Sequence, residues 1–85
     1  MSAITLYSKS FCGYCTAAKE LLRSNGYTIQ EINLEGDYAG IQDVMARSGQ
    51  RTLPQIFVND KPIGGYRELA SLISSGEFAE LLSQH

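Results

Sequence analysis

Metal ligands and cross-links are scarce in this chain of 85 residues. It contains two cysteines, Cys12 and Cys15, and one histidine, His85. A structural zinc site needs about four ligands, and a disulfide-rich secreted scaffold needs more than one closely spaced pair of cysteines. We therefore expect neither a metal site nor a disulfide framework. A reducing compartment is favoured over a secreted location.

Strong charge and long apolar runs are also missing. The formal net charge is −2, which gives no electrostatic reason to expect nucleic acid or an anionic membrane surface as a partner. No apolar run approaches the roughly 20 residues of a transmembrane helix. The N-terminal residues lack the basic and apolar regions of a signal peptide. We therefore expect a cytoplasmic protein. Since 44% of the residues are hydrophobic and no repeat or linker interrupts them, we expect a single domain over residues 1–85. We also expect a monomer.

The spacing of apolar residues predicts alternating strands and helices. Strands are expected over residues 3–7, 27–34, 55–59 and 62–64. Helices are expected over 13–25, from Asp37 to a stop at Gly49, around Leu69 to Ile73, and after Gly76. In the second strand the alternation slips, which predicts a bend or a sheet edge. This order indicates an α/β fold with a four-stranded mixed sheet and helices on both faces.

The most informative motif is Cys12-Gly13-Tyr14-Cys15, which follows the first strand and opens the first helix. Unpaired N–H groups and the helix dipole favour an anion at a helix start. They lower a cysteine pKa from about 8.5 into the range of roughly 3.5–7.5. The pair therefore predicts thiol–disulfide exchange, with Cys12 as the attacking sulfur. An inert pair is the alternative, although so short a loop gains little stability from a cross-link.

Lys9 and Phe11 precede the motif in the same loop, and Lys9 has both a functional and a structural interpretation. The ammonium group of Lys9 would favour a thiolate at Cys12 or bind a substrate carboxylate, or it is an ordinary solvated lysine. We expect Phe11 to pack the loop onto the core.

Two later segments add candidate sites. Pro54 belongs at a strand start. An ordinary trans bond to Leu53 is favoured for the position alone, whereas a cis bond would leave the Leu53 backbone free to face an extended ligand. Gly64 and Gly65 allow a close backbone approach just before a helix whose N–H groups suit a carboxylate. Arg51 precedes the proline segment and offers donors for a carboxylate.

Together these segments resemble a known family. Residues 9–15, 51–55 and 63–66 look like the three signature segments of a glutaredoxin, in order and spacing. The resemblance implies a thioredoxin-like fold with strand order 2-1-3-4 and a cis Leu53–Pro54 bond. It also implies glutathione as cosubstrate, with no tightly bound cofactor. The implied glutathione-binding residues are Lys9, Gln42 and Arg51 at the glycine carboxylate, Thr52, Leu53 and Pro54 along the backbone, Gly65, Tyr66 and Arg67 at the γ-glutamyl end, and Tyr14 beside the sulfur.

The chain departs from the family pattern at two positions. Many dithiol members have proline where this chain has Gly13, so a looser active-site loop is expected. Aspartate is common where Glu68 stands, which leaves the role of Glu68 open.

The resemblance predicts a glutathione-dependent thiol–disulfide oxidoreductase. Cys12 would be the nucleophile and Cys15 the resolving cysteine, acting on glutathionylated or disulfide-bearing client proteins. One alternative is a dimer that holds a [2Fe–2S] cluster through Cys12 of each chain and glutathione, since some members with glycine at the second motif position do so. Another is a small redoxin reduced by thioredoxin reductase, which the carboxylate-binding set Lys9, Gln42 and Arg51 argues against.

Overall fold

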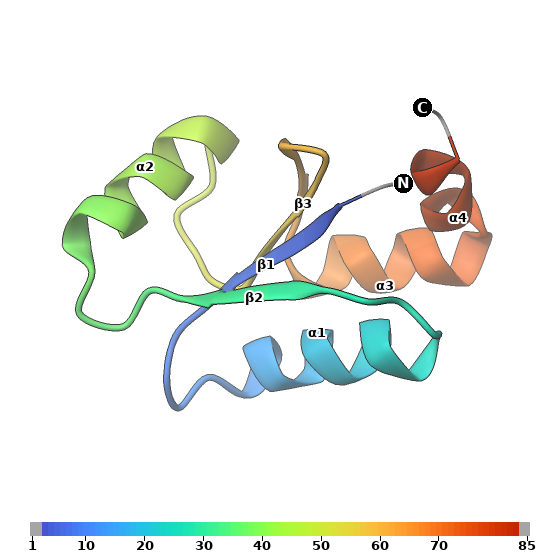
Figure 1. Cartoon of the computed structure of the whole chain (residues 1–85), viewed down its shortest axis with the longest axis horizontal. Coiled ribbons are helices and arrows are strands. Elements are labelled where there is room, and N and C mark those ends of the chain that lie inside the picture. Colours follow the sequence, from blue (N-terminus) through green and yellow to red (C-terminus); the bar gives the residue numbers. More distant parts are fainter. Residues whose placement is uncertain (1–2, 84–85) are drawn as a thin grey trace.

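The computed structural model describes residues 3–83, so His85 lies outside the described part of the chain. Its four strands form one mixed sheet in the order β2-β1-β3-β4. The β1 strand runs parallel to β2 and antiparallel to β3, which is antiparallel to β4. Figure 1 shows the sheet between its helices. The elements are β1 (Ile4–Ser8), α1 (Gly13–Ser24), β2 (Gln30–Asn33), α2 (Tyr38–Ser48), β3 (Gln55–Val58), β4 (Lys61–Gly64), α3 (Tyr66–Ser75) and α4 (Glu77–Leu82).

This architecture confirms the predicted α/β fold, strand order and two-sided arrangement of helices. The prediction for β2 was wrong at its ends, because only Gln30–Asn33 form the strand. The ring of Tyr27 instead packs edge-on against Phe78 of α4, with centroids 5.2 Å apart. The predicted edge is confirmed, since β2 is an outer strand of the sheet.

One face of the sheet carries the larger part of the core. Ile4 and Leu6 of β1 lie on this face with Ile56 and Val58 of β3. Alternate residues of a strand point to opposite faces, so these four side chains share one side. Helices α1, α3 and α4 cover them, and Figure 1 shows α1 and α3 on the side opposite α2.

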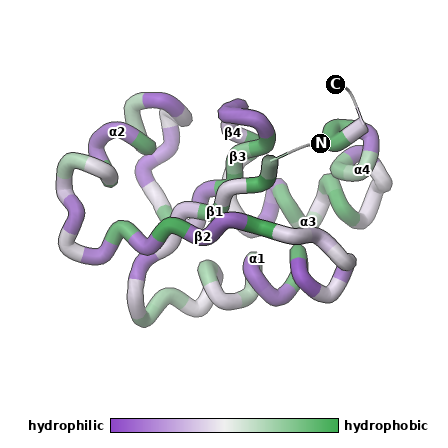
Figure 2. Tube along the Cα trace, viewed as in Figure 1, coloured by the Kyte–Doolittle hydropathy of each residue, from purple (hydrophilic) through white to green (hydrophobic). Residues whose placement is uncertain are grey.

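Helix α2 covers the other face of the sheet. Val44 of this helix packs in a cluster with Phe57 and Leu34. The guanidinium group of Arg47 lies 4.9 Å from the centroid of the Phe57 ring and donates a hydrogen bond to the Tyr7 hydroxyl at 3.0 Å. Apolar and polar residues alternate along α2 (Figure 2), as expected for a helix with one covered side.

The ends of α2 follow the signals in the sequence. The carboxylate of Asp37 accepts a hydrogen bond from the Gly40 N–H at 2.9 Å, and Gly49 ends the helix in the left-handed conformation, with φ 73°. Asp37 therefore sets where α2 begins, and Gly49 sets where the chain leaves α2 toward β3. Among residues 3–83, no helix is long and apolar enough to cross a membrane.

Candidate functional site

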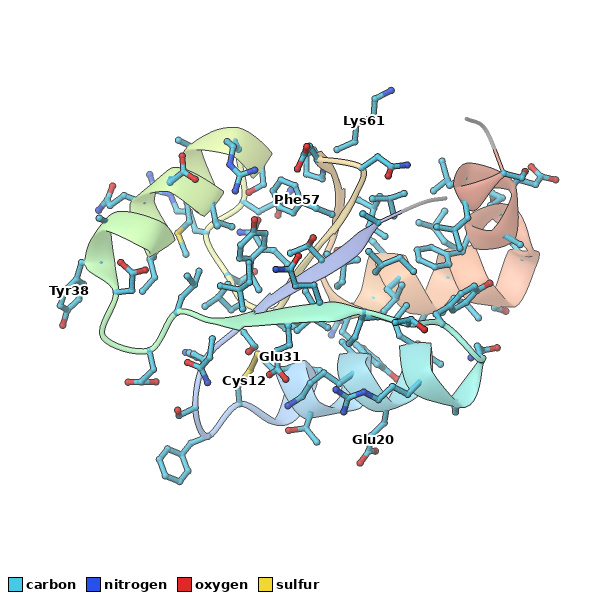
Figure 3. The ribbon with its side chains drawn as sticks, in the orientation of Figure 1. Cys12, Glu20, Glu31, Tyr38, Phe57 and Lys61 are labelled. Atoms are coloured by element: carbon cyan, nitrogen blue, oxygen red, sulfur yellow. A yellow bond between two sulfur atoms is a disulfide. The ribbon has the colours of Figure 1, made fainter. Side chains whose placement is uncertain are left out.

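The two cysteines lie at the N-terminus of α1, as predicted. Cys12 is the N-cap residue and is half-buried, whereas Cys15 is 2% exposed. The backbone N–H of Cys15 donates a hydrogen bond to Sγ of Cys12 at 3.2 Å. The two sulfurs form a disulfide, with Cα atoms 5.2 Å apart, within the span of ordinary disulfides. Figure 3 shows Cys12 where the chain enters α1. Only the first sulfur is open to a substrate.

The loop before Cys12 contradicts one prediction. Phe11 does not pack onto the core; its exposed fraction is 106% and its φ is 55°. The left-handed conformation costs an L-residue about 1–2 kcal/mol and turns the Phe11 side chain away from the sheet. The backbone of the preceding residue is fixed by a hydrogen bond, which the Ser10 N–H donates to Oε1 of Glu35 at 3.2 Å.

The segment before β3 runs beside the exposed sulfur. The Leu53–Pro54 bond is cis, as the resemblance implies. The carbonyl oxygen of Leu53 lies 3.9 Å from Sγ of Cys12. Gln55, which is 2% exposed, donates from its side-chain amide to the Gln50 carbonyl at 3.2 Å and so braces this loop. Sequence reasoning missed Gln55, although a polar residue opening an apolar strand was a usable signal.

The junction between β4 and α3 needs both of its glycines. Gly64 has a φ of +116°, and a Cβ there would lie within 2.8 Å of the Glu68 side chain. A Cβ on Gly65 would lie 3.3 Å from the Pro54 carbonyl oxygen, tighter than an ordinary contact. Gly65 therefore allows a close approach to the Pro54 backbone, and binding of a ligand carboxylate at this helix start stays a prediction. The Glu68 carboxylate accepts a hydrogen bond from the Gly65 N–H at 2.7 Å, so it caps α3.

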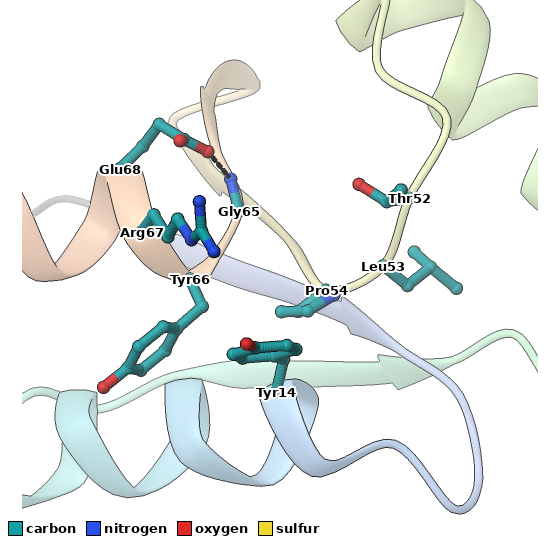
Figure 4. Close-up of a pocket in the computed structure, with 8 residues that line it drawn as sticks. All are labelled: Tyr14, Thr52, Leu53, Pro54, Gly65, Tyr66, Arg67 and Glu68. Atoms are coloured by element: carbon teal, nitrogen blue, oxygen red, sulfur yellow. Dashed lines mark hydrogen bonds between the residues drawn. The ribbon is translucent and has the colours of Figure 1, made fainter.

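These three segments enclose a pocket of about 330 Å³, a size found among small-molecule sites. Tyr14 of α1 and Tyr66 of α3 lie with ring centroids 5.8 Å apart. Figure 4 shows the loop before β3 and the start of α3 on opposite sides of the opening. The lining residues are Tyr14, Thr52, Leu53, Pro54, Gly65, Tyr66, Arg67 and Glu68.

A second pocket, of about 740 Å³, lies beside α2. It brings Gln42 and Arg51 together, and both side chains are exposed. Arg51 directly precedes Thr52, so the two pockets meet along one segment of backbone. Lys9 is exposed and lines neither pocket.

No group of three His, Cys, Asp or Glu side chains within residues 3–83 could hold a metal ion.

Comparison with known proteins decides the family. The glutaredoxin family model matches residues 4–63. The chain belongs to the glutaredoxin family. It is 39% identical over 82 residues to glutaredoxin 3 of Escherichia coli strain K12, an alignment that covers 96% of this chain and 99% of the relative. It is 37% identical over 84 residues to a glutaredoxin of Neisseria meningitidis serogroup A, covering 98% and 99%.

Solved glutaredoxins share the fold. The buckwheat glutaredoxin–glutathione complex superposes with a TM-score of 0.86 at 29% identity, covering 98% of this chain and 78% of that one. Oxidized glutaredoxin 2 from Chlamydomonas reinhardtii superposes with a TM-score of 0.81 at 30% identity, covering 98% and 81%. The chain is therefore a thiol–disulfide oxidoreductase of thioredoxin-like fold with two cysteines in its motif. The roles of the individual glutathione-binding residues stay predictions.

Proposed function

We propose that this glutaredoxin uses glutathione to reduce protein–glutathione mixed disulfides, and that it reduces protein disulfides through both cysteines. The observation that carries the proposal is the pocket beside Cys12. Its lining residue Leu53 places a backbone carbonyl 3.9 Å from Sγ of Cys12. The pocket therefore lies directly beside the nucleophile, which supports it as the site of a thiol-bearing ligand such as glutathione.

The first half-reaction transfers the glutathionyl group to Cys12. Its thiolate attacks the glutathionyl sulfur of the mixed disulfide, and the bond to Cys12 forms as the bond to the client sulfur breaks. The client leaves as a thiolate, which takes a proton from solvent. The N-cap position supports this step, because the Cys15 N–H at 3.2 Å donates to the sulfur that must carry the negative charge.

The second half-reaction restores the enzyme. The thiolate of a second glutathione attacks the glutathionyl sulfur bound to Cys12, which releases oxidised glutathione and returns the Cys12 thiolate. A client disulfide follows another route: Cys12 forms a mixed disulfide with the client, and Cys15 displaces the reduced client and closes the Cys12–Cys15 disulfide. Glutathione then reduces that disulfide. The 5.2 Å between the two Cα atoms permits this closure.

Several features support glutathione as the reductant. Arg67 and Glu68 give one end of the first pocket both charge signs, which suits the amino and carboxylate groups of a γ-glutamyl residue. Gln42 and Arg51 offer donors to a carboxylate in the adjacent pocket. We propose that Lys9 joins this carboxylate site from its exposed loop. The buckwheat relative was solved as a complex with glutathione.

The test is a glutathione-coupled assay on the wild type, Cys12→Ser and Cys15→Ser. Cys12→Ser should abolish activity on every substrate, because a serine hydroxyl is not ionised at neutral pH. Cys15→Ser should keep much of the activity on a glutathionylated peptide and lose activity on a protein disulfide. If both variants are inactive on the glutathionylated peptide, the route through Cys12 alone is wrong.

Two further readouts separate the alternatives. Reduction by thioredoxin reductase, with no response to glutathione, would replace the proposal with the small-redoxin alternative. Visible absorbance of protein purified without oxygen would indicate the shared [2Fe–2S] cluster.

A further inference from the structure

Phe11 is the most exposed large apolar residue in the described part of the chain, and it directly precedes the nucleophile. Its exposed fraction is 106%, against 60% for Tyr14 and 80% for Tyr38. Its φ of 55° is unusual for a bulky side chain. Neither the exposure of the ring nor the left-handed φ stabilises the folded protein. The ring also lines neither pocket. A ring placed this way is available for contact with another molecule.

The backbone on both sides of Phe11 is held in place. Before it, the Ser10 N–H is bonded to Glu35 at 3.2 Å. After it, Cys12 begins α1, and the Thr16 N–H donates to the Cys12 carbonyl at 3.1 Å. The backbone position from which the ring projects is therefore set by the fold, so docking costs little backbone conformational entropy.

The chemistry of exchange places a client beside this ring. When a client cysteine is bonded to Cys12, the two Cα atoms are about 4.4–6.8 Å apart. Consecutive Cα atoms are about 3.8 Å apart, so a residue flanking the client cysteine reaches the neighbourhood of Phe11. A small disulfide has no such flanking residue.

We propose that Phe11 is a docking residue for polypeptide clients. Its ring packs on an apolar side chain next to the reacting cysteine and so selects clients that carry one. The inference rests on the proposed function and adds the client's local sequence as a determinant of specificity.

The test compares Phe11→Asn with the wild type. Asparagine removes the ring but tolerates the left-handed conformation, so this variant should fold with a melting temperature equal to or above that of the wild type. The substrates are two glutathionylated peptides of equal length and charge, with Leu or Ser beside the cysteine, and the disulfide of cysteine with glutathione. Tyr38→Asn is the matched control, because Tyr38 is an exposed aromatic residue away from Cys12 (Figure 3).

The wild type should prefer the Leu peptide by about five- to tenfold in kcat/KM, the scale of shielding part of one aromatic ring from water. Phe11→Asn should lose this preference and keep its rate on the disulfide of cysteine with glutathione. Phe11→Trp and Tyr38→Asn should keep the preference.

A wild type without the preference, a Phe11→Asn variant that retains it, or a Tyr38→Asn variant that loses it would overturn the docking proposal alone. An equal loss by Phe11→Asn on all three substrates would overturn it as well, since that loss indicates a damaged active site. A wild type inactive on all three substrates would overturn the proposed function and the docking proposal together.

Discussion

Gly13→Pro should stabilise this protein without removing its glutathione-dependent activity. Gly13 is the first residue of α1, where the helical φ is close to the value that proline fixes and an N–H is not needed within the helix. The residue before a proline must be extended, and Cys12 already has φ −121° and ψ 106°. A Cβ on Gly13 would meet nothing within 4 Å. The substitution therefore needs no rearrangement.

The expected gain comes from the unfolded chain. Replacing glycine by proline at a compatible position stabilises a protein by about 0.4–1 kcal/mol, because it lowers the conformational entropy of the unfolded chain. In a domain of this size, 1 kcal/mol raises the melting temperature by about 4–8 °C, which gives an increase of about 2–8 °C. The bond from the Cys15 N–H to Sγ of Cys12 does not involve the N–H of Gly13, so activity should be retained.

Thermal melts in excess reductant measure this effect without a contribution from the disulfide. Gly49→Pro is the control, because Gly49 has a φ of 73° that proline cannot adopt, and it should be destabilised. If the melting temperature of Gly13→Pro is equal to or lower than that of the wild type, the backbone at position 13 does not accept proline without strain and this reasoning is wrong.

The remaining predictions concern the carboxylate site and acid stability. Arg51→Ala should raise the KM for glutathione about tenfold with little change in kcat, since an exposed charge-assisted hydrogen bond lies near the low end of about 1.5–3 kcal/mol. Arg23→Ala is the control. Equal KM values for Arg51→Ala and the wild type would show that the carboxylate site is misplaced. A hydrogen bond from Lys19, at 3.0 Å, is the main cause that lowers the pKa of Glu31 in the folded protein. Its stabilising effect is therefore present above the unfolded-state pKa and lost as the pH falls through the folded-state pKa. Melts between pH 7 and pH 3 should show a smaller loss of stability for Glu31→Gln than for the wild type or for Glu20→Gln, and equal slopes would contradict this.

Some features of Gly64, Gly65 and Glu68 were predictable from the sequence and others were not. A close approach at Gly65 was predictable because glycine is the residue that permits it. That the partner is the Pro54 carbonyl was visible only in the structure, because the predicted strand order does not specify which backbone atoms meet at the ends of β3 and β4. The role of Glu68 was open because aspartate is common there in the family, and the structure shows that its carboxylate caps α3 at the Gly65 N–H.

The sequence by itself determined the secondary structure elements, the sheet order through the family resemblance, and the cysteine pair at a helix start. These features follow from local periodicity, helix caps and motif spacing, which are properties of neighbouring residues. Only the tertiary structure decided that Phe11 faces solvent, that Gln42 and Arg51 share one pocket while Lys9 lines neither, and that Gln55 braces the loop at Pro54. These outcomes depend on backbone torsion and on contacts between segments distant in the chain, and apolar character or charge at one position does not specify either.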